Sequence, residues 1–376
     1  MTRLRRMLCL FIALGALVLA TPAWAAEEPA AGSGWEAGGT FTTKFQADIS
    51  KARGAPTRVS LYNDSELSFF ANYGSVFSLN GDIKYERTRA PNLLSYYPDR
   101  NNVFRSEAAT LRQLYVTVRP TDKVELYAGK IHPAFGSAYK LMPGLFYPFA
   151  TDYEQDERLG FGASVGLPLP GTPRLSVEVF KLDTTFLSNT VFSRPALNDP
   201  TAVRLLRYTH GQFGPSNTNG LRSVTAALRG GVAGEGLAWQ VSATHEATDQ
   251  PGARAENGFS IGGVYDPTGE GIRIGDVGVT PFAEYAVFEN FSTIRGLGRH
   301  YGQIGVSFGL DRWTLAFAGG VRVSSGSLRA TDHQQSVSMT YEVLDGLQVG
   351  AGLHRVIIGG RDSMTLAPAL SYETKF

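Results

Sequence analysis

The chain is almost without cysteine. Its 376 residues contain one, Cys9, which lies within the first 25 positions. If that segment is removed, the mature chain can form no disulfide, no thiolate metal site and no cysteine nucleophile.

The sequence also lacks an apolar segment long enough for a membrane-spanning helix. The run "MLCLFIALGALVLA" is short, follows three arginines in "MTRLRR" and precedes the small-x-small sequence Ala23-Trp24-Ala25. These are the three parts of a secretory signal peptide, and a run of this length does not span a bilayer as a helix. We predict a signal peptide over 1–25 and a short linker over 26–36.

Excess charge of either sign is absent as well. Loss of Arg3, Arg5 and Arg6 with the signal peptide leaves 32 basic residues against 34 acidic ones. This balance argues against nucleic acid as a partner.

Histidines are few and dispersed. They stand at His132, His210, His245, His300, His333 and His354. None has the spacing typical of zinc or copper ligands, and no strand offers a Ser–His pair with an orienting acid. We therefore expect neither a cofactor nor enzymatic activity.

Apolar and polar residues alternate throughout the chain. The stretch "GTFTTKFQADIS" sets Phe41 and Phe45 against Lys44 and Gln46. Period-two alternation is typical of a β-strand with one apolar and one polar face. The 43 glycines, 22 phenylalanines and 16 tyrosines also favour many strands.

The end of the chain shows the same pattern. In "SMTLAPALSYETKF", Leu370, Tyr372 and Phe376 share one face, and Glu373 and Lys375 the other. A strand of this kind at an open sheet edge is an aggregation hazard, so it needs a partner. The natural partner is the N-terminal strand of a closed barrel.

Sixteen such segments can be assigned. They are 37–49, 58–71, 75–87, 106–118, 122–132, 157–167, 173–183, 220–231, 236–248, 256–266, 277–290, 299–309, 312–325, 334–343, 347–358 and 363–376. Connections at one end are mostly tight turns such as "PTDK" and "DR", and those at the other include long loops, with a possible extra strand pair at "AVRLLRYTH". Strands of about 10 residues with this asymmetry are typical of an all-β transmembrane antiparallel β-barrel with short periplasmic turns and long outer loops. We predict a single barrel domain over 37–376.

One hairpin resembles a known family. The segment "LRQLYVTVRPTDKVELYAGKIHPAFGSAY", Leu111 to Tyr139, is similar to the trimeric, sixteen-stranded porins of Gram-negative outer membranes, general and substrate-selective. The shared pattern is an arginine, an aliphatic-aromatic strand, a turn carrying Asp122, and a strand ending in Gly129 and Lys130. The resemblance implies a homotrimer in the cell outer membrane, in contact with its lipids. It also implies that Phe376 and Tyr372 present the last strand to the barrel-assembly machinery, and that the third outer loop folds into the pore.

That loop, about 133–156, contains acids and aromatic residues. The predicted constriction combines acids at Asp152, Glu154, Asp156 and Glu157, tyrosines at Tyr139 and Tyr147, and facing wall bases at Lys44, Lys84, Arg112, Arg229 and Arg322. Opposed charges in a narrow pore make a transverse field that favours polar solutes. In the alternative interpretation, the acids lie in a solvated outer loop and the aromatics form an interfacial girdle.

Two functions remain open. The first is a porin that lets small hydrophilic solutes or ions diffuse passively. The second is a barrel that serves as a scaffold or sleeve around an envelope partner, because lumenal glycines such as Gly320 and Gly352 leave room for water or for an inserted chain.

Overall fold

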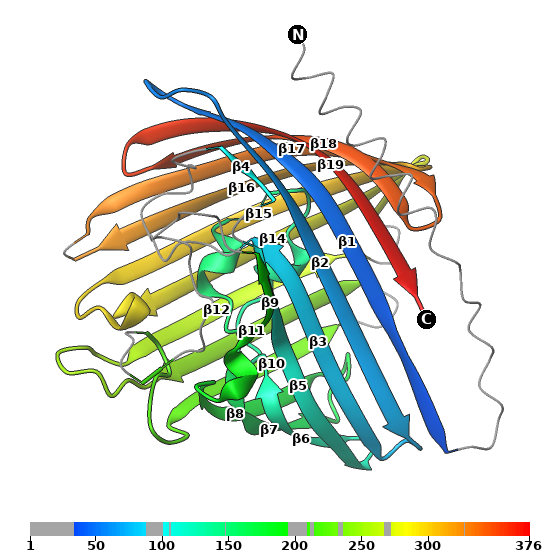
Figure 1. Ribbon diagram of the computed structural model, residues 1–376. Coiled ribbons are helices and arrows are strands. Elements are labelled where there is room, and N and C mark those ends of the chain that lie inside the picture. The colour runs from blue at the N-terminus through cyan, green and yellow to red at the C-terminus, as the bar shows by residue number, and fades with distance from the viewer. Residues whose placement is uncertain are drawn as a thin grey trace.

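The computed structural model shows a closed barrel of 16 long antiparallel strands (Figure 1). It describes residues 34–87, 101–104, 107–146, 148–194, 209–210, 214–231, 236–266, 272–326 and 328–376. The long strands are β1 (Trp35–Ala52), β2 (Arg58–Tyr73), β3 (Phe77–Arg87), β5 (Glu107–Thr121), β6 (Val124–Ile131), β7 (Arg158–Gly166), β8 (Arg174–Leu182), β10 (Ser223–Gly231), β11 (Leu237–Glu246), β12 (Glu256–Tyr265), β14 (Val277–Glu289), β15 (Gly298–Leu310), β16 (Trp313–Ser325), β17 (Ala330–Leu344), β18 (Leu347–Ile358) and β19 (Arg361–Lys375). Each coincides with one of the sixteen predicted segments, so the predicted fold class is confirmed.

The first and last strands close the barrel, as the C-terminal alternation predicts. β1 pairs with β19 from Thr40 opposite Lys375 to Ala52 opposite Ser363. Beyond the last strand residue, Phe376 exchanges two backbone hydrogen bonds with Gly39, of 2.9 and 3.1 Å. A side chain at Gly39 would meet the Phe376 ring at 2.7 Å, so the missing Cβ makes room for the terminal aromatic.

Three short strands extend the sheet where long strands end. β4 (Asn102–Val103) pairs in parallel with β2, β9 (Thr190–Arg194) pairs with β5, and β13 (Ile272–Ile274) forms a hairpin with β14. The sequence analysis missed all three as separate strands. The possible strand pair in residues 202–210 lies almost wholly outside the described residues.

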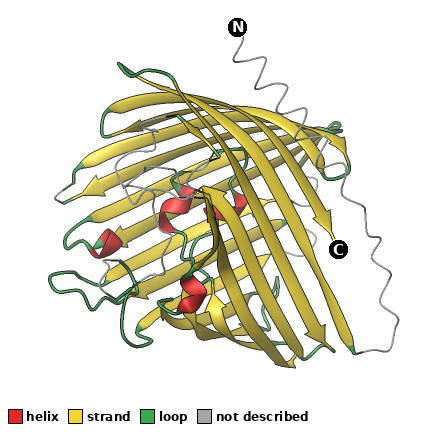
Figure 2. Cartoon of the chain, viewed as in Figure 1, coloured by secondary structure: helices red, strands yellow, loops and turns green. Residues whose placement is uncertain are grey.

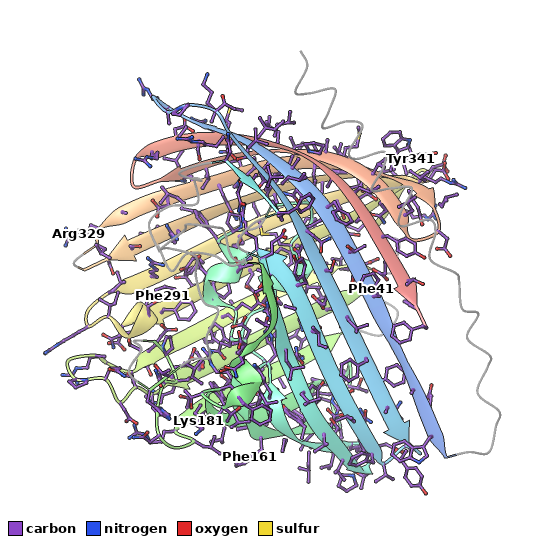
Figure 3. The ribbon with its side chains drawn as sticks, viewed as in Figure 1. Phe41, Phe161, Lys181, Phe291, Arg329 and Tyr341 are labelled. Atoms are coloured by element: carbon purple, nitrogen blue, oxygen red, sulfur yellow. The ribbon has the colours of Figure 1, made fainter. Side chains whose placement is uncertain are left out.

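The two faces of the wall are inverted relative to a soluble sandwich. On β16, Phe317 points outward and is 44% exposed, whereas Arg322 points inward and is 2% exposed. Figure 3 shows Phe161 on the outside of the wall at β7, where its side chain is also exposed. An apolar exterior and a polar interior are the arrangement of a barrel that spans a bilayer.

The connections differ between the two ends of the barrel. The tight turns, such as 122–123 and 311–312, lie at the end where the C-terminus lies, and the long loops at the other (Figure 1). Residues 132–157, between β6 and β7, form the third outer loop and contain α2 (Ala138–Leu141) and the 3₁₀ turn η1 (Ala150–Tyr153). Among the described residues, no helix has the length and apolar character needed to cross a bilayer.

Candidate functional site: the third outer loop and the lumen

The third outer loop lies inside the ring of strands rather than above it. Figure 2 shows its helical turns within the barrel, and its polar atoms bond side chains that point inward from β5, β11, β14, β15, β16 and β17. The loop begins at β6 and returns to β7, which are neighbouring strands. Its position is therefore set by contacts with more distant parts of the wall.

One carboxylate on β14 holds both halves of the loop. Glu284 accepts hydrogen bonds from the backbone N–H and the hydroxyl of Ser137, each at 2.6 Å, and from the N–H of Ala138 at 3.2 Å. It also accepts a hydrogen bond from the hydroxyl of Tyr153 at 2.5 Å, and that hydroxyl accepts one from Gln303 at 2.8 Å. Because Glu284 is buried, these donors stabilise its charge and fix the loop at both points.

An arginine on β16 holds the η1 turn. Arg322 contacts Asp152 of the loop and Asp332 of β17, each at 2.7 Å, and its guanidinium lies 4.9 Å from the centre of the Phe149 ring. The N–H of Phe149 donates to Gln334 on β17 at 3.3 Å. The sequence analysis paired Asp152 and Arg322 as opposed charges, and the structure brings them into direct contact.

A second arginine binds the returning arm of the loop. Arg112 of β5 lies 2.7 Å from Glu154 and 2.9 Å from Asp156. Burial disfavours the charged form of both acids, but Arg112 and Arg158 hold the pKa of Asp156 below its ordinary value. For Glu154 burial outweighs Arg112, and its pKa is raised.

The last predicted acid is buried in a charge cluster. Glu157 lies 3.1 Å from Lys130 of β6, and Lys130 lies 3.2 Å from Asp183 and donates to the carbonyl of Leu187 at 3.1 Å. The side chain of Lys130 is 0% exposed. This cluster ties the third outer loop to the segment after β8.

The aromatic residues of the loop serve mainly as packing. Phe135, Phe149 and Tyr153 are buried in a core with Phe288 and Tyr301 of the wall. Ring contacts join Phe135 to Phe288 at 5.3 Å and Tyr153 to Tyr301 at 4.9 Å. The residues that the sequence suggested as a girdle therefore attach the loop to the wall.

Two further rings of the loop stack on histidines. Tyr139 lies 4.9 Å from His132, and Phe146 lies 4.9 Å from His354 of β18. Burial, with the nearby charges of Lys140 and Arg112, lowers the pKa of His132 well below 6.5. Tyr147 lies outside the described residues.

The remaining predicted wall bases lie in two places. Lys44 contacts Asp64 at 3.6 Å, and Lys84 lies between Asp64 at 3.8 Å and Glu86 at 3.2 Å, so these bases are partly neutralised on β1 to β3. Arg229 of β10 is exposed and, among the described residues, has no carboxylate within salt-bridge distance.

Sequence reasoning missed the loop's own base, Lys140. Its side chain is exposed to the lumen, and its pKa is lowered by loss of hydration and by the charge of Arg229. Glu66 of β2 and Asp82 of β3 attract it from the wall. Both carboxylates accept from the hydroxyl of Ser68, at 3.5 and 2.9 Å. The sequence did contain a signal for these two wall acids, because Glu66 and Asp82 lie at polar positions of strands in which apolar and polar residues alternate.

A cavity of about 790 Å³ lies beside Tyr139 and Lys140, toward the short-turn end. Its lining includes the side chains Tyr115, Tyr127, Tyr139, Lys140, Arg174 and Arg229. Among the described residues, no group of three histidine, cysteine or acidic side chains is arranged to hold a metal ion.

No model of a known protein family matches the sequence, and no curated protein sequence is significantly similar to it. Solved structures do match. The outer-membrane channel DcaP of Acinetobacter baumannii aligns over 90% of this chain and 97% of its own, with 13% identity and a TM-score of 0.57. The chain has the fold of the outer-membrane porins.

Two other porin-fold structures have similar scores. OprB of Pseudomonas putida aligns over 91% of this chain and 94% of its own, with 11% identity and a TM-score of 0.59. The anion-selective porin of Comamonas acidovorans aligns over 90% and 99%, with 10% identity and a TM-score of 0.57. At these identities the likeness establishes the porin fold, and the solute has to be inferred from this chain's own residues.

Proposed function

We propose that the protein is a passive outer-membrane channel for small hydrophilic solutes, narrowed by its third outer loop. The observation that carries this proposal is the Glu284 anchor. One buried carboxylate binds the loop at Ser137 and again at Tyr153, which supports a loop held in place inside the barrel. Beside it a polar cavity of about 790 Å³ stays open toward the short-turn end. A polar lumen with a fixed narrowing sorts solutes by size and charge.

The charges at this narrowing suggest which solutes pass. The loop acids contact arginines directly, as Glu154 does with Arg112, and such contacts reduce the charge that these acids present to a solute. Lys140 is the exposed charge of the loop, and Glu66 and Asp82 act on it from the wall. We infer a field that runs from Lys140 toward these two acids, which orients polar solutes and opposes apolar ones.

The alternative of a sleeve around a partner has less support. A partner threaded through the barrel would need the space that α2, η1 and the Phe135 core occupy. A sleeve would also have no use for a loop held by a buried carboxylate, since burial of Glu284 is favourable only when its donors are in place.

Liposome swelling tests this proposal. Vesicles with the reconstituted protein should swell in small sugars and amino acids at rates that fall with solute size. Glu284→Gln should weaken the anchor and admit larger sugars, whereas Glu289→Gln on the outward face of the same strand should not. Vesicles that do not swell in any solute would refute the channel.

The oligomer and the assembly signal belong to the same proposal. We infer a homotrimer from the resemblance of the 111–139 hairpin to the trimeric porins of Gram-negative outer membranes. Light scattering in detergent should give three chains per particle, and a monomer would contradict it.

For Phe376, we infer recognition by the barrel-assembly machinery. Its ring is 52% exposed and adds little burial, so its deletion should lower the amount of assembled barrel in cells. The urea midpoint of molecules that do assemble should change little. Normal assembly of the deletion variant at normal expression would contradict the inference.

A further inference from the structure

Two arginines face each other across neighbouring strands of the lumen. Arg229 of β10 is the direct antiparallel partner of Arg174 of β8. Both line the 790 Å³ cavity at the short-turn end, and both are exposed. Side chains in such positions start about 5 Å apart, and like charges there destabilise the pair.

No salt bridge in the described part of the chain compensates this pair, although Glu178 attracts Arg229 from within the same cavity. Arg174 donates to the hydroxyl of Ser164 at 3.2 Å, which carries no charge. Neither arginine has a carboxylate within salt-bridge distance among the described residues, although most other lumenal bases do, as Arg112 and Arg322 show.

A third cation approaches from the loop. Lys140 lines the same cavity, and Arg229 is the nearby charge that acts on it most strongly. Its ammonium lies 5.3 Å from the centre of the Tyr139 ring and has no salt bridge within the described ranges. Three cations without a salt bridge among the described residues, from β8, β10 and the third outer loop, therefore line the same cavity.

The acids of the cavity, Glu125, Glu178 and Asp266, form no salt bridge with these three bases within the described ranges. Glu125 accepts from Arg119 at 2.9 Å, and Glu178 accepts from the hydroxyl of Tyr127 at 2.6 Å. Arg174, Arg229 and Lys140 therefore line the cavity with their charged groups in no salt bridge among the described residues.

We propose that Arg174, Arg229 and Lys140 form a binding subsite for a small dianion, a dicarboxylate or inorganic phosphate, at the periplasmic mouth of the channel. A dianion between the two arginines removes their repulsion and accepts charge-assisted hydrogen bonds from both guanidinium groups. Its place in a transport path rests on the proposed channel function, but its existence as a binding site does not.

Calorimetric titration of the folded protein in detergent tests the site without any transport. Succinate and phosphate are the probes, with succinamide as a neutral control, at constant low ionic strength. Wild type should bind at least one of the two dianions and not succinamide. Binding of succinate alone identifies a dicarboxylate subsite, and binding of phosphate alone a compact anion subsite. Binding of neither would overturn the proposal.

Variants locate the site. The double variant Arg174→Gln/Arg229→Gln should weaken dianion binding by about a hundredfold and Lys140→Gln by about tenfold, because each removed charge at a few ångströms is worth about one decade. Arg312→Gln, in a tight turn at the same end and outside the cavity lining, is the matched control and should bind as wild type does. Equal affinity in the double variant and in Arg312→Gln would overturn the assignment.

A conductance measurement separates this inference from the proposed function. Dianion added on the periplasmic side should block the current in a concentration-dependent way, and the double variant should relieve the block. An open channel that no dianion binds or blocks would refute the subsite and leave the channel standing. Dianion binding by a protein that never conducts would refute the channel and leave the subsite.

Discussion

The guanidinium of Arg112 on β5 lies 2.7 Å from the carboxylate of Glu154 in the third outer loop and 2.9 Å from that of Asp156. One base thus contacts two of the four acids that the loop sequence presents. The charge that a passing ion meets is set by this pairing and not by the number of acids in the loop.

The pairing predicts the effect of removing Arg112. Arg112→Gln should leave Glu154 and Asp156 without their main partner, so the channel should become more selective for cations and the loop less firmly held. Reversal potentials in a salt gradient measure the first effect, and current noise measures the second. Adding Asp156→Asn, which removes one negative charge for the positive charge lost, should restore the wild-type reversal potential. An unchanged potential in the single variant would mean that these acids lie outside the ion path.

The buried cluster at Lys130 predicts a loss of stability. Lys130→Met removes the cation that contacts both Glu157 and Asp183, and breaking a buried pair costs about 3–5 kcal/mol. The triple variant that adds Glu157→Gln and Asp183→Asn should recover much of this loss. Urea unfolding in lipid vesicles measures both, and a loss below about 1 kcal/mol in the single variant would contradict the account.

The register of β16 predicts opposite tolerance at two positions. Phe317→Arg places a charge on the outward apolar face and should cost about 2–4 kcal/mol if it lies near the middle of the bilayer. Thr314→Arg, on the inward parity of the same strand, should be tolerated. Equal losses in urea unfolding would show that the two faces are assigned wrongly.

Because His132 is buried, we expect acid to reduce the stability of the folded chain. Its ring nitrogen Nε2 is buried without a hydrogen-bond partner, and its pKa lies well below 6.5 because burial disfavours the charged ring. Below about pH 6.5 the unfolded chain therefore binds a proton at His132 that the folded chain does not bind. The stability that the neutral ring contributes is complete above that pH and is lost as pH falls.

His132→Phe keeps a ring to stack on Tyr139 and removes the titration. The urea midpoint of wild type should fall more between pH 7.5 and pH 5 than that of the variant. Acid-sensitive carboxylates that do not interact with His132 are present in both proteins, so they cancel in the comparison. Identical pH dependence in the two proteins would exclude His132 as a source.

The sequence predicted the barrel well because the two faces of a strand appear in the sequence as alternating apolar and polar residues. All sixteen long strands and the closure of β1 on β19 follow from that alternation. The short strands β4 and β9 could not be found in this way, because they lie in long loops and are defined by pairing with the ends of β2 and β5.

The site was predicted less completely, because the spacing of residues along the sequence does not show which side chains contact each other in the folded chain. The sequence named Arg112, Arg322 and the loop acids, and the structure joins these groups directly. It missed Glu284, because a single acid at a polar strand position looks like any other lumenal residue. Lys140 was overlooked because the acids around it dominated the composition of the loop.

Single-channel recording in a planar bilayer tests the central claim most directly. The account predicts discrete, stepwise openings from barrel-folded protein in simple salt, with larger steps for Glu284→Gln than for Glu289→Gln, because only the first substitution weakens the hold on the third outer loop. Persistent absence of steps from protein whose fold is verified in the same preparation would contradict it.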